Sequence, residues 1–280
     1  MQVTYLGTTV LLFDDGIDQI LFDAHITRPS IPTFLFGKMQ TDEKAAEQIF
    51  QVHGMDRLRA IFISHSHHDH VLDMPFFANR TGADVYGSES TLNVARGGHV
   101  QEEKLHLFAA GKLVSIGEYR ITVLPSRHSK PGCYNNDLGQ EIIEPVVQPA
   151  GRKAFKEGGS YDFLVQHGKR TYLIRPSYNY IEGQLDGIKA DVLFLGVAGI
   201  TKSTEEERES FCRETLDKVQ PKLVIPIHWD NFFTPLSKRQ YAMPVFMEST
   251  REVHRLARQC CEERNIQYKI MLPQTKLGHV

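Results

Sequence analysis

The chain has 280 residues, of which 41% are hydrophobic and 24% are charged, with a formal net charge of −2 at pH 7. This is the composition of a globular protein, and it lacks the overall positive charge that favours nucleic-acid binding. No apolar stretch is long enough to cross a bilayer, the N-terminus lacks the features of a signal peptide, and the four cysteines form no CxxC motif. We therefore expect a cytoplasmic protein without disulfides.

The first part of the chain begins with strands. Residues 3–13 and 19–24 alternate as an antiparallel hairpin does, and residues 27–39 form a loop rich in proline. A helix is expected at 43–54, with a cap at Thr41 or Asp42. The short apolar run at 58–64 is typical of a buried strand. After it we expect a helix at 74–82, a strand at 83–88 and a helix at 89–98.

The second part alternates between strands and helices. A hairpin at 112–129 turns at Gly117, and a second hairpin is expected at 161–177. Residues 129–160 are rich in proline and glycine, and a loop of this length usually serves a function, so we expect a lid. The remaining elements are strands and helices in alternation, expected at 190–199, 203–220, 222–230, 245–264 and 266–272. We expect residues 1–280 to form one α/β domain of sheets covered by helices.

Histidines gather directly after the buried strand at 58–64. The stretch HSHHDH carries His65, His67, Asp69 and His70 within six positions. Residues two apart in an extended segment point the same way, so His65 and His67 can bind one metal ion. Asp69 and His70, where the chain turns into the next helix, can face a second ion. Imidazole and carboxylate ligands without thiolates suit zinc, iron or manganese; His68 is expected to stay unliganded.

The stretch HSHHDH resembles the HxHxDH motif of the metallo-β-lactamase fold superfamily. The resemblance extends further, because His128 follows a mid-chain strand and His228 follows a late strand, as metal-binding histidines do in that family. The segments around residues 19–30 and 155–165 are similar to the branch of L-ascorbate-6-phosphate lactonase-like and related cytoplasmic metal-dependent hydrolases. The resemblance implies an αββα four-layer sandwich. It also implies one metal site of His65, His67 and His128, and a second of Asp69, His70 and His228.

One feature departs from the family pattern. The family has an aspartate that bridges the two metal ions after the strand in the 170s, whereas this chain has Arg175, Pro176 and Ser177 there. Without a bridging anion, two dications repel each other more strongly and each loses a ligand. We therefore expect one ion, or two with the second bound weakly. If Arg175 points inward, its guanidinium could bind an anionic group of the substrate.

The predicted chemistry is hydrolysis by a metal-bound hydroxide, with Asp69 orienting the nucleophile and accepting its proton. The substrate would be a small-molecule ester, lactone, amide or phosphodiester, contacted by His25, Arg175 and Tyr178. The cofactor would be one or two zinc ions, with manganese or iron as alternatives. Asp23, Asp73 and Asp230 are candidates to hold the outer nitrogens of the ligand histidines.

Other functions are also compatible with parts of the sequence. A catalytically impaired or non-catalytic metal- or ligand-binding protein on the same scaffold is the main alternative, because the bridging aspartate is absent. A nuclease would need an added domain or a basic arm, and a di-iron redox enzyme would need an electron-delivering partner. We expect a small-molecule substrate, no nucleic acid and no membrane, and the composition is compatible with a homo-oligomer.

Overall fold

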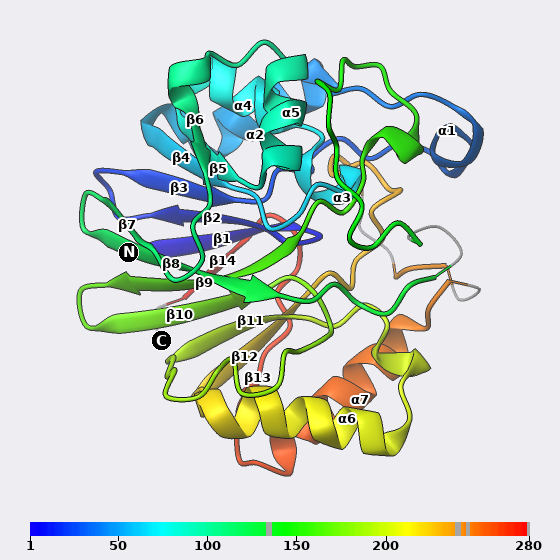
Figure 1. Cartoon of the computed structure of the whole chain (residues 1–280). Coiled ribbons are helices and arrows are strands. Elements are labelled where there is room, and N and C mark those ends of the chain that lie inside the picture. The colour runs from blue at the N-terminus through cyan, green and yellow to red at the C-terminus, as the bar shows by residue number, and fades with distance from the viewer. Residues whose placement is uncertain (133–135, 239–241, 245–246, 279–280) are drawn as a thin grey trace.

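The computed structural model describes residues 1–132, 136–238, 242–244 and 247–278. Two seven-stranded sheets pack face to face, and helices cover the outer face of each sheet (Figure 1). This arrangement confirms the predicted αββα four-layer sandwich. In the described part of the chain, no helix is both long enough and apolar enough to cross a membrane.

The first sheet is built mostly from the N-terminal part of the chain. Its strand order is β14-β1-β2-β3-β4-β5-β6; the pairs from β14 to β3 are antiparallel, and those from β3 to β6 are parallel. The strands are β1 (Gln2–Gly7), β2 (Val10–Asp14), β3 (Gln19–Phe22), β4 (Leu58–Phe62), β5 (Asp84–Gly87), β6 (Leu105–Leu107) and β14 (Thr275–Leu277).

The second sheet repeats this pattern. Its order is β13-β12-β11-β10-β9-β8-β7, with antiparallel pairs from β7 to β10 and parallel pairs from β10 to β13. The strands are β7 (Leu113–Ile116), β8 (Tyr119–Ser126), β9 (Ser160–His167), β10 (Arg170–Arg175), β11 (Val192–Gly196), β12 (Leu223–Ile227) and β13 (Gln267–Tyr268). Buried parallel strands need apolar side chains on both faces, which explains the unbroken apolar sequence of β11 and β12.

The helices lie in the two outer layers. Those near the first sheet are α1 (Ile31–Phe36), α2 (Glu43–His53), α3 (His68–Val71), α4 (Met74–Thr81) and α5 (Glu89–Gly97), and those over the second are α6 (Glu205–Cys212) and α7 (Thr250–Glu262). Side-chain caps fix several helix starts: Asp42 accepts from Ala45 at the start of α2, as predicted, and Thr204 forms a capping box with Glu207 at α6.

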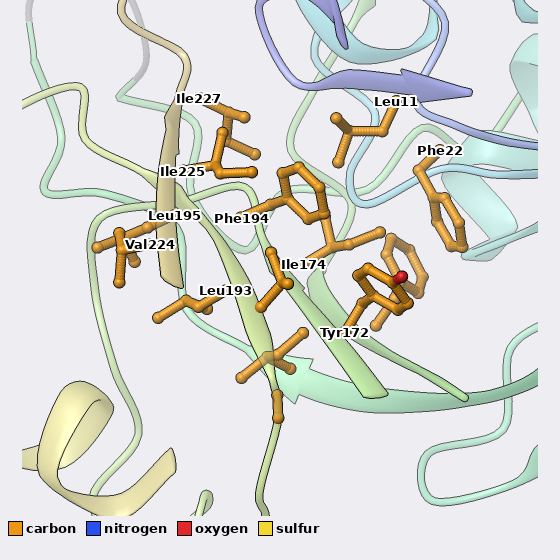
Figure 2. Packing of buried hydrophobic residues seen from close by; sticks show 14 of the residues in the cluster. Leu11, Phe22, Tyr172, Ile174, Leu193, Phe194, Leu195, Val224, Ile225 and Ile227 are labelled. Atoms are coloured by element: carbon orange, nitrogen blue, oxygen red, sulfur yellow. The ribbon is translucent and has the colours of Figure 1, made fainter. Parts of the chain in front are cut away.

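The space between the sheets is filled by aromatic and branched side chains. Figure 2 shows Phe194 and Ile174 of the second sheet pointing toward Leu11 and Phe22 of the first. The ring of Phe13 lies 6.1 Å from that of Phe194. A second cluster of buried residues joins the outer face of the first sheet to the helices above it. The two sheets are therefore held together by a continuous apolar layer, which fixes the loops at their ends.

The structure corrects several sequence predictions. The proline-rich loop at 27–39 contains helix α1, which begins with Pro32 in its first turn, a position where proline needs no hydrogen-bond donor. The helix expected at 203–220 is α6 followed by a π-helical turn at Arg213–Asp217. The strand expected at 266–272 is short, and β6 and β14 were not predicted. Cys133, in the predicted lid, and residues 245–246, at the start of the last predicted helix, lie outside the described residues.

Candidate metal centre

The first group of predicted ligands lies beyond the end of β4. His67 has an extended backbone, with φ −63° and ψ 149°, and is the N-cap residue of α3. His128, two residues after β8, lies beside this segment. Ring centroids of His65, His67 and His128 are 4.7–4.9 Å apart, and one ligand atom from each lies within 4.8 Å of the others. We call these three residues the first group.

The second group consists of Asp69, His70 and His228. Asp69 and His70 lie on α3, and His228 directly follows β12. One ligand atom from each lies within 4.8 Å of the others, and His228 Nε2 lies 3.3 Å from Asp69 Oδ2. His228 has a φ of 60°, and its N–H donates to the carbonyl of Thr8 at 2.5 Å. A non-glycine residue in this conformation is strained, and such strain is typical of functional sites.

The donor atoms fit a divalent cation. His70 Nδ1 lies 2.7 Å from Asp23 Oδ2, and His128 Nδ1 lies 2.9 Å from the carbonyl of Ser129, so the Nε2 atom of each ring remains for a metal. The Nε2 atom of His65 is buried and has no hydrogen-bond partner within the described residues. A buried polar atom without a partner is costly unless it binds something the protein itself does not supply. Nitrogen and carboxylate donors of this kind suit zinc, iron or manganese.

The two groups differ in charge. Burial lowers the pKa of His65 well below its usual value and that of His128 to about 3, so both rings are neutral at pH 7. Burial would raise the pKa of Asp69, but the nearby His70 and the hydrogen bond with His228 outweigh it and lower that pKa. Asp69 is therefore ionised. Burial lowers the pKa of His228, but its bond to Asp69 outweighs burial and raises it.

Both groups lie in the wall of a cavity of about 1480 Å³. The aromatic part of the lining includes Phe34, Phe155, Tyr178, Tyr180, Phe211 and Phe232. Part of the predicted lid also lines it, through residues such as Gln140 and Lys156. The cavity is large enough for a small molecule beside the ligand groups, since ligand pockets usually occupy about 300–1,000 Å³.

Of the three predicted substrate contacts, only Tyr178 lines this cavity. Its ring packs against Phe211 at 4.2 Å between centroids, and its hydroxyl lies 3.3 Å from that of Ser203. His25 is fully buried, with Nδ1 3.3 Å from Thr8 Oγ1, and it is absent from the cavity wall. The prediction that His25 contacts substrate is therefore not supported, because the loop that carries it folds into the interior.

The structure also corrects the prediction for Arg175. Its side chain is fully buried, and its Nε lies 2.9 Å from Asp162 Oδ2. The remaining guanidinium nitrogens donate to the hydroxyl of Thr215 and the carbonyl of Asn179, at 2.8 and 2.7 Å. Arg175 is thus a structural cation paired with Asp162 and does not line the cavity. Within the described residues, no acid is shared by the two ligand groups.

The three candidate outer acids have different partners. Asp23 contacts His70 and also accepts from the N–H and hydroxyl of Ser64, at 2.7 and 2.9 Å. Asp73 instead holds the backbone of Ile26 and Thr27, and Asp230 accepts from Tyr5 and Thr8 beside Arg28. Only Asp23 contacts a predicted ligand ring, so Asp73 and Asp230 stabilise the neighbouring loops.

One contact at the centre was missed from the sequence. Asp137 Oδ1 lies 3.1 Å from His67 Nε2, although Asp137 is 70 residues away along the chain. Burial raises the pKa of Asp137, but the hydrogen bond with His67 outweighs it and lowers that pKa below its usual value. The only sequence signal was the length of the loop at 129–160, which indicated a function but not a residue.

Comparisons with known proteins show the family and the fold of the chain. A family model described as the beta-lactamase superfamily domain matches residues 18–229. A UPF0173 metal-dependent hydrolase from Carboxydothermus hydrogenoformans is 23% identical over 238 residues, which cover 83% of this chain and 86% of that protein.

Two solved structures share the fold. The metallo-beta-lactamase fold protein YhfI from Bacillus subtilis has a TM-score of 0.58 at 14% identity, with 99% of each chain covered. Zn(2+)-bound PqqB from Methylobacterium extorquens has a TM-score of 0.56 at 12% identity, with 100% of each chain covered. At these identities the likeness concerns the fold alone.

Proposed function

Because this chain belongs to the beta-lactamase superfamily, we propose that it is a metal-dependent hydrolase of a small-molecule ester, lactone, amide or phosphodiester. The observation that carries the proposal is the convergence of six donor residues, from three separate segments, on the wall of one cavity. The relatives named as metal-dependent hydrolases support the general activity. We also propose that residues 1–280 form one domain, since both sheets share one core.

We propose that the first group and the second group each hold one zinc ion, with manganese or iron as alternatives. A bound divalent cation would lower the pKa of a water molecule and polarise the oxygen of the bond to be cleaved. The residues named as ligands are His65, His67 and His128 in the first group, and Asp69, His70 and His228 in the second.

The chain's own residues would prepare the reaction. Asp69 is ionised and is held by His228, so its carboxylate can orient a water molecule and accept its proton. Asp23 holds the ring of His70 from the side away from the cavity. Tyr178 offers a hydroxyl on the wall, and the aromatic rings around it favour a substrate with an apolar part. No serine or cysteine nucleophile is required.

The test is metal analysis combined with a hydrolysis assay on a panel of lactones, esters, amides and phosphodiesters. We expect bound zinc, turnover of at least one class and loss of turnover with a chelator. His67→Ala should lose most of this activity. His99→Asn is the matched control, because His99 is exposed and has a φ of 62°, which asparagine tolerates. Activity that survives both the chelator and His67→Ala would overturn the proposal.

A second candidate function is a metal- or ligand-binding protein without catalysis. It is favoured by the end of β10, where the chain places the buried Arg175 rather than a shared acid. This candidate predicts protein that binds metal or a metabolite but turns over nothing in the panel. The same metal analysis and assay therefore separate the two functions.

A further inference from the structure

Part of the predicted lid reaches the metal centre through one carboxylate. We call residues 136–159 the strap. Asp137, near its start, lies with Oδ1 3.1 Å from His67 Nε2, and the two side chains are 22% and 10% exposed. Asp137 also lines the cavity. This contact is the one place where an acid outside the six predicted ligands meets a ring of the first group within the described residues.

The contact distinguishes His67 from three of the other ligand rings. His65, His70 and His128 each engage Nδ1 with an outer partner: the hydroxyl of Ser64, the carboxylate of Asp23 and the carbonyl of Ser129. His67 instead engages Nε2 with Asp137, which leaves Nδ1 for a cation. A carboxylate behind a ligand imidazole fixes its tautomer and ring orientation and makes it a more basic ligand. Each group thus contains one imidazole backed by a carboxylate.

The strap is built to hold Asp137 in this place. Glu157 is buried, and its carboxylate accepts from the N–H of Gly139 at 2.7 Å and from the hydroxyl of Ser160 at 2.6 Å. The carbonyl of Glu157 accepts from the N–H of Ser66, which lies between His65 and His67. One buried residue, Glu157, therefore joins the turn after Asp137 to the segment that carries the ligands.

We propose that Asp137 is a positioning residue that orients His67 with Nδ1 toward the first metal ion, so that the affinity of this site depends on the strap. The first group otherwise consists of three imidazoles, and among the described residues no carboxylate is shared by the two groups. Asp137 would supply negative charge close to the first ion without taking a ligand position. The inference concerns metal binding and holds whether or not the protein is a hydrolase.

The experiment measures zinc affinity in competition with a chromophoric chelator, using the full chain in a His228→Ala background that leaves the first group intact. Asp137→Ala should lower zinc affinity by about 10–100-fold, the usual effect of losing such an outer partner. Asp137→Asn keeps a hydrogen-bond acceptor but loses the charge, so its loss should be intermediate. Glu144→Gln is the matched control, because Glu144 is an exposed acid of the same strap, and its affinity should stay within about twofold of the parent.

The visible spectrum of the Co²⁺-substituted protein provides a second measurement that a general loosening of the strap would not change in the same way. We expect Asp137→Ala to keep the intensity of a four- or five-coordinate site but to shift its bands, since the ring of His67 turns. Equal zinc affinity in Asp137→Ala and the parent would overturn the proposal. Complete loss of the bound ion would also overturn it, in favour of Asp137 as a direct ligand. Circular dichroism and the Tm check that each variant is folded.

Discussion

The two ligand groups line the same cavity but consist of different types of side chain. The first group consists of three imidazoles, two of which burial keeps neutral at pH 7. The second contains Asp69, whose ionised carboxylate is held by His228. Imidazoles bind a cation through the lone pairs of their nitrogens, which must be correctly oriented, whereas a carboxylate also attracts the cation over a distance. We expect the second group to depend on charge and the first on orientation.

The carboxylates that hold the outer nitrogens of the ligand histidines also differ between the two groups. The second group is backed by Asp23, which is buried in the first sheet layer and contacts His70, Ser64 and Thr9. The first is backed by Asp137, which comes from a loop. An interior acid therefore supports the second group, and an acid on a loop supports the first. The comparison suggests that a change in the loop would alter only the first site.

The largest expected effect comes from removing the charge of the second group. Asp69→Asn keeps the size of the side chain but loses the anion and the proton acceptor, so kcat/KM should fall by about 10²–10⁴-fold. Zinc bound at the second group should fall as well, while the first group keeps its ion. Zinc titration and steady-state kinetics measure the two effects. Equal losses at both groups would show that they do not act separately.

The two groups are separate because β10 ends in Arg175, and no described acid is shared between them. Arg175→Met leaves Asp162 as a buried, unpaired carboxylate and should lower the free energy of unfolding by about 3–5 kcal/mol. The double variant with Asp162→Asn should recover most of this loss. Urea unfolding monitors both variants. If zinc affinity fell in the double variant despite recovered stability, Arg175 would have a role at the metal centre after all.

A smaller effect is expected from changing Asp23, the acid that contacts His70 of the second group. Asp23→Asn removes the carboxylate behind His70 and should lower zinc affinity at the second group by about 10–100-fold. Measured in a His128→Ala background, this loss can be compared directly with that of Asp137→Ala at the first group. Similar losses would mean that a buried acid and an acid on a loop support a ligand equally well.

The free energy of unfolding of the metal-free protein should depend on pH in opposite ways through His128 and His228. The folded pKa of His128, about 3, lies below its unfolded value of 6.5, so the unfolded state binds more protons in this range. Stability should fall as pH drops below 6.5, by up to about 1.4 kcal/mol per pH unit for each such ring. His228 has a raised pKa, so its contribution is present below 6.5 and is lost as pH rises through its folded pKa.

Urea unfolding between pH 4 and 8 tests these opposite signs in protein stripped with a chelator. His128→Gln should flatten the loss of stability on the acid side. His228→Gln should instead remove a loss on the neutral to alkaline side. A variant pair with the same pH profile would contradict the charge difference between the groups.

The sequence predicted the features that depend on local pattern. Apolar runs indicated the buried strands, and the spacing of His65 and His67 after β4 indicated a common direction. The placement of His128 and His228 came from a resemblance in the order of motifs, since no local pattern joins them to the cluster. Two sheets that pack face to face bring these distant strand ends together, which explains why the order of motifs was informative.

Other features could not be predicted because they depend on tertiary contacts. A residue at a strand end can face either side of the sheet, and Arg175 faces Asp162 on the neighbouring strand. His25 was expected to contact the substrate, but Asp73 holds the backbone of Ile26 and Thr27, and the loop that carries His25 lies in the interior. Asp137 was missed because nothing in a loop sequence specifies which side chain reaches a partner 70 residues away.

The donor residues come from both sheets, so a bound ion would link the two halves of the sandwich. Because the ion binds the folded state and not the unfolded state, it would stabilise the folded state by about 2.7 kcal/mol when free metal exceeds its Kd a hundredfold. The lifetime of the folded chain would then follow the supply of metal around it. Scarcity of the ion would raise the unfolded fraction of the chain and, with it, the rate of its proteolysis.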